Sequence, residues 1–390
     1  MKILADTSMP FASGAFSTLG ETTLVDGRTL GADDLHGVDL LFVRSTTRVD
    51  DALLRHADRL QFVGSGVAGT DHVDVPLLAQ RGIAFASAAG CNAESVAQYV
   101  TAALLHLARR YSFRLRGKTM GIVGAGNVGK RVVEQARGLG LEVLVCDPPR
   151  QRDPGDSEAR GFLPFGEVLA RADILTLHVP LNTNPADSDC TRHLLNAANL
   201  PRLKPGALLI NAARGPVVDG AALLAHLYAF PRTLCALDTW ANEPLCDAML
   251  ASRVHIATPH IAGHSVEGKV NGTRLVYEAA CRYLNATPSF DFQLPSPPRA
   301  EIHADAACFA DPEDLLHDLA LAVCDLRADD AAFRVSMQST NPGKAFDLLR
   351  QNYNSRREFS AYRPVLQNST PALRETLRGL GFQVAQGVLP

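Results

Sequence analysis

TMGIVGAGNVG, residues 119–129, joins an apolar β-rich run to glycines spaced as G-x-G-x-x-G, and a helical pattern follows directly. Glycines in this position let the backbone turn tightly and approach a pyrophosphate, which then lies against free N–H groups at the helix N-terminus. The six letters alone are a weak signal, but a preceding strand and a following helix are the context that a dinucleotide site requires. The alternative is a tight turn without a ligand. The residues expected to contact a dinucleotide here are Gly124, Gly126, Asn127, Val128 and Gly129.

An acidic residue indicates which dinucleotide binds. Asp147 lies 18 residues after Gly129, at the end of a predicted strand over residues 141–146. A carboxylate in this position accepts hydrogen bonds from the adenosine ribose hydroxyls and repels a 2′-phosphate, so NAD is favoured over NADP. Because Arg150 follows closely and could hold a 2′-phosphate, NADP stays open as the alternative.

Short apolar runs alternate with helical patterns on both sides of this motif, which predicts parallel sheets and an α/β fold. The earlier runs are residues 2–5, 40–43, 61–64 and 83–86. The later runs are residues 119–123, 141–146, 174–178, 207–211, 234–238 and 255–257. The later set predicts one doubly wound, Rossmann-type NAD-binding domain, and the earlier set predicts a flavodoxin-like substrate lobe.

Two long helical patterns and a proline-rich stretch suggest the domain boundaries. A helix over 92–110 is long enough to bridge two lobes, and a helix over 266–285 would return the chain to the first lobe. Four prolines between residues 287 and 298 indicate a linker. We expect a discontinuous substrate lobe of residues 1–92 plus about 264–286, an NAD-binding domain of residues 93–263, a linker of residues 287–299 and a small α/β C-terminal domain of residues 300–390. The elements expected in that last domain are helices over 312–327, 342–352 and 371–380, and strands over 362–366 and 382–385.

Composition and charge argue against several other classes of protein. Lys plus Arg is 38 and Asp plus Glu is 41, so the net charge of −3 gives no general reason to bind nucleic acid or anionic lipid. No membrane span or signal peptide is apparent, and we expect a cytoplasmic protein. The eight cysteines show no C-x-x-C spacing and are expected to be buried, reduced thiols. Three histidines are spaced like metal ligands, but a Thr-Pro pair at 258–259 interrupts any shared helix face, so no metal is expected. These are His255, His260 and His264.

Three polar residues stand at predicted strand ends, the edge at which ligands of open α/β sheets bind. Arg214 can hold a substrate carboxylate through its planar fork. His260 can take a hydroxyl proton, and Glu243 can orient the imidazole ring. Each residue taken singly could equally be a structural ion pair or a core histidine. Their order after a dinucleotide motif favours hydride transfer from a carbon that bears a hydroxyl group next to a carboxylate.

The motifs around these residues resemble those of the D-isomer-specific 2-hydroxyacid dehydrogenases. They are INAARG at 210–215, LDTWANEP at 237–244 and TPHIAG at 258–263. Within that family, one branch acts on a phosphorylated four-carbon acid, and the likeness to it covers essentially the whole chain. The segments that carry this closer likeness are residues 43–48, 68–74, 89–93, 146–150, 341–343, 347–353 and 356–358. The resemblance implies oxidation of 4-phospho-D-erythronate by NAD to 3-hydroxy-2-oxo-4-phosphobutanoate, a step of pyridoxal 5′-phosphate (vitamin B6) biosynthesis.

The resemblance also implies roles for single residues. Arg214 and Glu243 match the catalytic pair, and His260 matches the proton donor or acceptor. Ser45 matches a substrate-binding serine. The NAD-binding positions that the resemblance implies are Asp147, Val179, Ala212, Ala213, Arg214, Asp238 and Gly263.

Three residues depart from the family pattern and leave the exact acid open. Val67 and Val179 stand where threonines are usual, and His264 stands where a substrate-contacting tyrosine is usual. Val67 and His264 are the expected substrate contacts that differ. One alternative is therefore the same chemistry on another D-2-hydroxy acid, of the 3-phosphoglycerate or hydroxypyruvate type. The alternative from a different class is an NAD-sensing binding protein without turnover.

A substrate phosphate needs cations or clustered donors. Arg44 and Ser45, at the end of a predicted strand, are expected to hold it. The alternative is that Arg44 and Arg48 are solvated loop charges. The resemblance implies that the C-terminal domain pairs subunits into a homodimer. A partner subunit could then lend the site one of a second group of cations, Arg350, Arg356 and Arg357.

Overall fold

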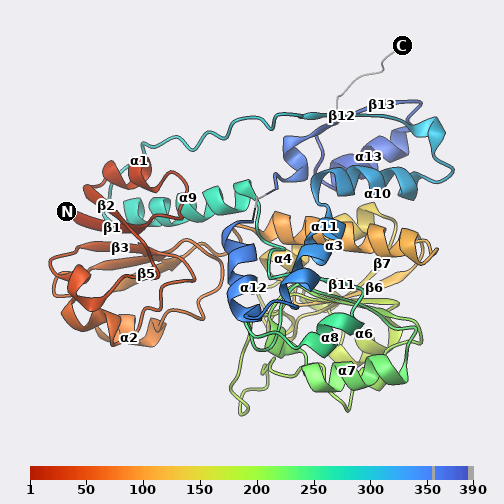
Figure 1. The fold of residues 1–390 in the computed structure, drawn as a ribbon, viewed down its shortest axis with the longest axis horizontal. Helices are drawn as coiled ribbons and strands as arrows, with labels where there is room; N and C mark the ends of the chain where they lie inside the picture. The colour runs from red at the N-terminus through yellow and green to blue at the C-terminus, as the bar shows by residue number, and fades with distance from the viewer. Residues whose placement is uncertain (354–355, 385–390) are drawn as a thin grey trace. The chain divides into compact units, whose positions relative to one another are not determined.

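The computed structural model describes residues 1–353 and 356–384. The chain divides into two compact units, each formed from two stretches of sequence. Unit 1 consists of Met1–Ala93 and Ser265–Pro295, and unit 2 consists of Glu94–His264 and Ser296–Pro390. Both are built on parallel sheets, and the predicted α/β fold is confirmed (Figure 1).

Unit 1 holds a five-stranded parallel sheet in the order β2-β1-β3-β4-β5, the order typical of flavodoxin-like folds. Its strands are β1 (Lys2–Asp6), β2 (Glu21–Val25), β3 (Leu40–Val43), β4 (Phe62–Ser65) and β5 (Ala84–Ser87). Its helices are α1 (Ala12–Ser17), α2 (Val75–Gln80) and α9 (Val266–Tyr283), with the short 3₁₀ turns η1 (Ala32–Leu35) and η2 (Leu53–His56). The edge strand β2 was not expected from the sequence, because its polar, mostly exposed residues lack the apolar run of a buried strand.

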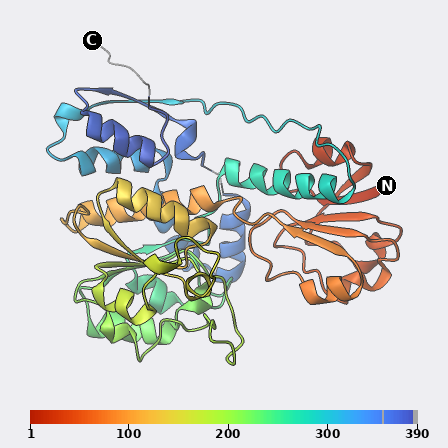
Figure 2. The same ribbon diagram turned by 180° about the vertical axis from the view of Figure 1, so that it is seen from behind.

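Helix α9, far along the chain, packs on the same sheet as α1. Phe16 of α1 stacks on Phe42 of β3 with ring centroids 3.7 Å apart, and Val276 of α9 joins the same buried cluster. The approach is close because Gly272 of α9 has no side chain: a Cβ there would lie 2.3 Å from the carbonyl oxygen of Gly66. Figure 2 shows α9 running alongside the sheet of unit 1.

Unit 2 holds a six-stranded parallel sheet in the order β11-β10-β9-β8-β6-β7, so the predicted doubly wound domain is confirmed. Its strands are β6 (Thr119–Val123), β7 (Glu142–Cys146), β8 (Ile174–Leu177), β9 (Leu208–Asn211), β10 (Leu234–Leu237) and β11 (Ile256–Ala257). The strand order reverses between β6 and β8, which is where such sheets bind ligands. Successive side chains of a strand face opposite sides, so Ile122 joins the core on one face and Val123 the core on the other.

Helices cover both faces of this sheet (Figure 1). Those from the central part of the chain are α3 (Ala93–Arg110), α4 (Asn127–Gly138), α5 (Pro148–Gln151), α6 (Phe165–Arg171), α7 (Gly220–Ala229) and α8 (Ala248–Arg253), with the 3₁₀ turns η3 (Ala159–Gly161), η4 (Leu200–Arg202) and η5 (Gly215–Val217). The C-terminal segment adds α10 (Pro312–Val323), α11 (Leu326–Ser336), α12 (Pro342–Gln351) and α13 (Pro371–Gly379), with the turns η6 (Ala306–Cys308) and η7 (Phe359–Ala361). Of these, α10 and α13 lie over α3 and α4 and not directly on the sheet (Figure 1). The C-terminal segment shares both cores, since Leu377 lies in one and Phe333 in the other.

The C-terminal segment differs from the sequence-based expectation in three places. The helix predicted over 312–327 ends at Val323, and Asp325 caps a new helix by accepting a hydrogen bond from the Arg327 N–H at 3.1 Å. An unexpected strand, β12 (Glu301–Asp305), pairs in parallel with β13 (Arg363–Gln367). It was missed because polar residues alternate with Ile302 and Ala304 instead of forming an apolar run. Residues 382–384 of the strand predicted over 382–385 form no strand, and residue 385 lies outside the described residues.

The burial of the eight cysteines is less uniform than expected. Cys91, Cys146, Cys235, Cys281 and Cys324 are buried. Cys190 and Cys246 are half-buried, and Cys308 is exposed in the turn after β12, so the expectation of eight buried thiols was wrong. Among the described residues, no helix has the length and apolar character that crossing a membrane would need.

Candidate active site

The glycine-rich loop between β6 and α4 has the geometry of a phosphate cradle. Gly124 has a φ of +92°, and a Cβ there would lie 2.7 Å from the His178 carbonyl group. A Cβ on Gly129 would lie 1.9 Å from the Gly124 carbonyl oxygen, so neither position tolerates a side chain. Gly126, in contrast, is exposed and a Cβ there would meet no protein atom within 4 Å. This open space lies beside the first N–H groups of α4 and can therefore take a pyrophosphate, whereas a side chain on Gly126 would fill it.

The helix start next to Gly126 keeps its donors available. Gly126 is the N-cap of α4 and has no side chain to bond the first N–H groups, which begin at Asn127. Asn127 is exposed and Val128 is half-buried. The twelve-residue helix adds the partial positive charge of its N-terminus to these donors.

Asp147 and Arg150 lie beside the same loop. One carboxylate oxygen of Asp147 accepts the Ala125 N–H at 2.7 Å, and the other accepts the Arg150 N–H at 3.1 Å. The guanidinium of Arg150 donates to Asp156 and to Glu158 and therefore already has two carboxylate partners. A 2′-phosphate would meet the carboxylates of Asp147, Asp156 and Glu158, and the charge of Arg150 is already compensated by two of them. This arrangement favours NAD over NADP.

Other expected cofactor contacts follow the neighbouring strands. Val179 lies two residues after the end of β8 and is half-buried. Its backbone nitrogen would lie 2.9 Å from a Cβ on Gly124. Ala212 and Ala213 follow β9, and Gly263 follows β11. In a parallel sheet these positions share the carboxyl edge, which is also where the glycine-rich loop lies.

The loop that carries Arg214 is held by its own side chains and by the next loop. Asn211, fully buried, accepts the Ala213 N–H at 3.1 Å and donates to the Arg214 carbonyl at 3.0 Å. Arg214 itself is half-buried and donates to the Ala213 carbonyl at 2.9 Å. A Cβ on Gly215 would lie 1.9 Å from the Trp240 carbonyl carbon, so the loops after β9 and β10 are in direct backbone contact.

Glu243 and His260 form the pair that the sequence suggested. The Nδ1 atom of His260 lies 2.7 Å from Glu243 Oε2, and Glu243 Oε1 accepts the Trp240 N–H at 2.7 Å. Burial raises the pKa of Glu243, but the His260 charge and the donors around the carboxylate outweigh this and leave the pKa below its usual range. Because the ionised carboxylate accepts from Nδ1–H, the imidazole presents Nε2 as the atom that can accept a proton.

Asp238 holds the turn that carries His260. Its side chain is 1% exposed, and it accepts the Ile261 N–H at 2.8 Å and the Ala262 N–H at 2.9 Å. It also accepts the Thr258 hydroxyl at 2.7 Å, while the Thr258 oxygen lies 2.7 Å from the hydroxyl of Tyr99. Burial raises the pKa of Asp238, opposed by the charge of His260 and by these donors. The carboxylate expected to contact NAD therefore has three donors from the chain itself.

This support is needed because His260 has a φ of +56°, in the left-handed region that costs a residue with a side chain roughly 1–3 kcal/mol. The His260 N–H donates to the Asp238 carbonyl at 2.7 Å, so both the backbone and the side chain of Asp238 hold the turn. Neither Thr258 nor Tyr99 was predicted from the sequence. No signal could have linked them, because the hydroxyls are 159 residues apart in the chain.

The expected substrate residues fall in both units. In unit 1, Arg44 and Ser45 follow β3 and Val67 follows β4, so all three are at the carboxyl edge of that sheet. Arg44 donates to the Ser8 carbonyl at 3.1 Å. Sequence reasoning missed Lys269 of α9, where burial and the nearby positive charge of Arg44 lower the pKa of the amine. The edge therefore carries two cations close enough to repel each other, which an anion would relieve.

His264 belongs to unit 2, where its ring packs against Tyr353 with centroids 5.9 Å apart. Of the other two histidines considered as metal ligands, His255 uses Nδ1 to accept the Cys235 N–H at 3.1 Å. Over the described residues, no three His, Cys, Asp or Glu side chains are grouped as a metal site.

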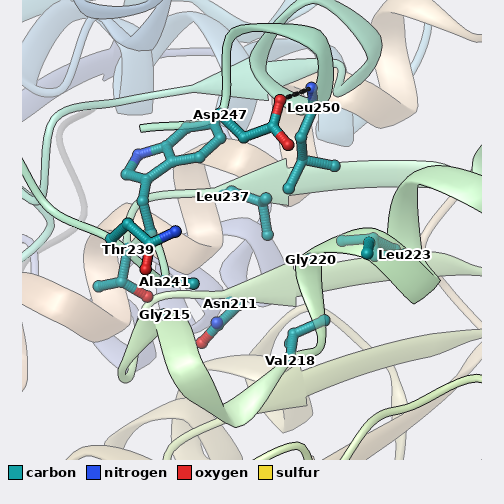
Figure 3. Close-up of a pocket in the computed structure, with 13 residues that line it drawn as sticks. Asn211, Gly215, Val218, Gly220, Leu223, Leu237, Thr239, Ala241, Asp247 and Leu250 are labelled. Carbon is teal, nitrogen blue, oxygen red and sulfur yellow. Dashed lines mark hydrogen bonds between the residues drawn. The ribbon is translucent and has the colours of Figure 1, made fainter. Parts of the chain in front are cut away.

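A pocket of about 220 Å³ is lined by residues of the loops that follow β9 and β10, together with residues of α7 and α8 (Figure 3). Val218, Leu223 and Leu237 form much of its wall, and Asn211 and Thr239 contribute polar atoms. None of Arg214, Glu243 and His260 lines it. The pocket is therefore distinct from the catalytic candidates, which follow the adjacent strands β9, β10 and β11 of the sheet.

Comparisons with known proteins agree with this geometry. Residues 88–262 match the family model of the D-isomer specific 2-hydroxyacid dehydrogenase, NAD binding domain. Residues 293–381 match a model described as a domain of unknown function. Among solved structures, the TT0316 protein from Thermus thermophilus is 26% identical with a TM-score of 0.64, covering 74% of this chain and 98% of its own. The NAD⁺-bound 3-phosphoglycerate dehydrogenase of Entamoeba histolytica has a TM-score of 0.63 at 21% identity, covering 76% of this chain and 98% of its own, and shows the shared fold.

Curated relatives extend over nearly the full chain. The erythronate-4-phosphate dehydrogenase of Azotobacter vinelandii is 45% identical over 98% of this chain and 100% of its own length. The protein of the same name from Chromohalobacter salexigens is 44% identical over 98% of this chain and 99% of its own. The chain therefore belongs to the erythronate-4-phosphate dehydrogenases, within the D-isomer-specific 2-hydroxyacid dehydrogenase family.

Proposed function

We propose that this protein oxidises 4-phospho-D-erythronate to 3-hydroxy-2-oxo-4-phosphobutanoate with NAD, as a step of pyridoxal 5′-phosphate biosynthesis. The observation that carries the proposal is the contact of 2.7 Å between His260 Nδ1 and Glu243 Oε2. It places a polarised imidazole at the carboxyl edge of a sheet whose first loop is an open phosphate cradle. The family membership of the chain supports the same reaction.

The proposed roles follow from the chemistry of each side chain. His260 removes the proton of the substrate's 2-hydroxyl group through Nε2 and, as an imidazolium, is stabilised by the carboxylate of Glu243. Arg214 binds the substrate carboxylate and draws electron density from the carbonyl group that forms at C2. The hydrogen bonds of Asn211 limit the freedom of the Arg214 loop, so the guanidinium needs little reordering on binding.

NAD, when bound, accepts the hydride that leaves C2. The residues that would hold it are those of the glycine-rich loop, with Gly126 and Asn127 toward the pyrophosphate and Asp147 toward the adenosine ribose. Val179, Ala212, Ala213, Asp238 and Gly263 stay proposed contacts. Because Asp238 already has three donors, we propose that its main contribution is to hold the His260 turn.

We propose that the substrate phosphate is bound by Arg44 and Ser45, with Lys269 as an additional cation. Burial and the positive charge of Arg44 lower the pKa of Lys269, and a dianionic phosphate would stabilise both cations. Arg48 is a matched control, because it pairs with Asp50 at 3.1 Å and is well exposed. Arg44→Ala should raise KM for the phosphorylated acid about tenfold or more, whereas Arg48→Ala should leave it unchanged. Equal KM values in both variants would support the alternative of solvated loop charges.

A homodimer formed through the C-terminal segment, and a cytoplasmic location, also remain proposals. The mass of the full-length protein in solution, measured by light scattering over a range of concentrations, tests the first.

The decisive experiment is NADH formation by the purified protein with 4-phospho-D-erythronate beside 3-phosphoglycerate, D-glycerate and D-lactate, with a 2-oxo acid present to reoxidise bound cofactor. Selective turnover of phosphoerythronate would support the proposal and make Val67 and His264 tolerated differences. Preference for another acid would keep the dehydrogenase and assign its specificity to those two positions. NAD binding without turnover of any acid would favour the sensing protein.

A further inference from the structure

The carbonyl side of the His260 turn meets a residue from the C-terminal segment. Arg356 Nη2 donates to the Ala262 carbonyl at 2.7 Å and to the Ser95 carbonyl, in the first turn of α3, at 2.8 Å. Its Nη1 lies 3.4 Å from the Ile261 carbonyl oxygen and 3.5 Å from that of His264. The two short contacts are good hydrogen bonds, and the two long ones add electrostatic attraction.

The opposite side of this turn is held by Asp238, which accepts the N–H groups of Ile261 and Ala262. A carboxylate therefore binds the donors of the turn while a guanidinium binds its acceptors. The two partners are far apart in sequence, since Ala262 is 24 residues from Asp238 and 94 residues from Arg356. Together they fix a backbone segment that begins with the strained φ of His260.

Burial makes the guanidinium a rigid partner. Arg356 is 9% exposed, and a buried cation must be compensated by acceptors and counter-charges. Cys324, Tyr353 and Asp329 lie near the guanidinium, and the Tyr353 hydroxyl donates to Asp329 Oδ2 at 3.2 Å. Burial raises the pKa of Asp329 to about 6, although the charge of Arg356 opposes this. The guanidinium is therefore held at the carbonyl side of the catalytic turn in buried surroundings.

We propose that Arg356 is a positioning residue for catalysis, which orients His260 by holding the carbonyl groups of Ile261, Ala262 and His264. It lies in the segment that matches a domain of unknown function, so this role would give that segment a part in the chemistry of its own chain. The proposal rests on the proposed function, because it is the base of that reaction that Arg356 orients. A displacement of about 1 Å at a reacting group can lower the rate about 10²-fold.

The test compares Arg356→Lys and Arg356→Ala with Arg334→Lys. Arg334 is a matched control because it also binds main-chain carbonyls, those of Ala251 and Val254 at 2.8 and 2.9 Å, but contacts no residue of the turn. We expect kcat for phosphoerythronate to fall about tenfold in Arg356→Lys and about 10²-fold in Arg356→Ala. KM for NAD should stay within about twofold, because the glycine-rich loop is untouched. Added guanidinium ion, below denaturing concentration, should restore part of the kcat of Arg356→Ala but not of His260→Ala.

A second readout needs no turnover. The Nδ1 proton of His260, hydrogen-bonded to Glu243, should give a low-field proton resonance that is absent from His260→Ala. The resonance should weaken or shift in both Arg356 variants and stay unchanged in Arg334→Lys. If wild-type protein turns over no acid, the proposed function fails, and this resonance still decides whether Arg356 positions His260.

The proposal would be overturned by folded Arg356 variants with wild-type kcat and an unchanged resonance. It would also be overturned if Arg334→Lys lost kcat to the same degree, because the effect would then be general destabilisation. Should Arg356→Ala not fold, Tyr353→Phe removes one hydroxyl that supports the guanidinium, with little change of volume. A kcat lowered several-fold with unchanged KM for NAD would support the proposal, and a wild-type kcat would refute it.

Discussion

Replacing Glu243 by glutamine tests the proposed mechanism most directly, because the carboxylate serves two donors at once. Oε1 accepts the Trp240 N–H and Oε2 accepts His260 Nδ1–H, each at 2.7 Å. An amide has one acceptor oxygen and one donor nitrogen. If its oxygen stays with the backbone N–H of Trp240, its NH₂ group faces His260 Nδ1. The imidazole must then carry its proton on Nε2, where it cannot accept the substrate proton.

The structure gives the size of the effect. Returning the ring to the productive tautomer sacrifices one hydrogen bond in a site where the side chains of His260 and Glu243 are only 31% and 21% exposed. A lost bond to a largely buried group costs about 1–3 kcal/mol. A cost of about 1–3 kcal/mol on the productive tautomer corresponds to a fall in kcat of about 5- to 150-fold.

The assay is the pH dependence of kcat and kcat/KM for phosphoerythronate oxidation between about pH 5 and 10. In Glu243→Gln kcat should be lower than in wild type over this whole range, because an amide does not titrate and donates to Nδ1 at every pH. Glu167→Gln is the control, since Glu167 forms an exposed pair with Arg171. A Glu243→Gln protein with kcat within about threefold of wild type over this range would refute the orienting role of Glu243.

His260→Ala should lower turnover about 10² to 10⁴-fold, with NAD affinity measured by calorimetry unchanged; near-native turnover would exclude His260 as the base. Asp147→Ala should weaken NAD binding and reduce the preference of the protein for NAD over NADP. An unchanged ratio of the NAD and NADP dissociation constants would show that Asp147 does not contact the ribose. Gly126→Val should weaken NAD binding without changing the melting temperature, because a Cβ at this position would meet no protein atom within 4 Å. Gly129→Ala should instead lower the melting temperature, because its Cβ would lie 1.9 Å from a carbonyl oxygen. The pKa of Asp329 is raised to about 6 in the folded protein from its ordinary value of 3.8. Asp329 therefore stabilises the folded state most when the pH is below 3.8, and this stabilisation is lost as the pH rises through 6. The stability of wild type relative to Asp329→Asn should therefore fall by up to roughly 3 kcal/mol between pH 4 and 7, and a pH-independent difference in denaturant unfolding would contradict the raised pKa.

The sequence by itself determined the fold class, the family and the cofactor. These depend on local patterns: glycines at a strand-to-helix turn, and apolar runs long enough to be recognised one at a time. The expected roles of Arg214, Glu243 and His260 also came from short motifs at strand ends. Where local signals were ambiguous, the sequence misled: Asp325 ended one helix and began another inside a continuous helical pattern, and the polar strands β2 and β12 had no apolar run to reveal them.

Only the tertiary structure decided what supports the catalytic candidates. The 2.7 Å contact of Glu243 with His260, the three donors on Asp238 and the proximity of Lys269 to Arg44 depend on how separate loops and helices pack. Arg356 is the extreme case, because its partners are main-chain carbonyls up to 261 residues away. Every residue has a carbonyl group, so the sequence does not indicate which carbonyl groups a buried guanidinium will bind. The packing of the C-terminal segment against the turn determines this, because the buried charge is stable only where acceptors surround it.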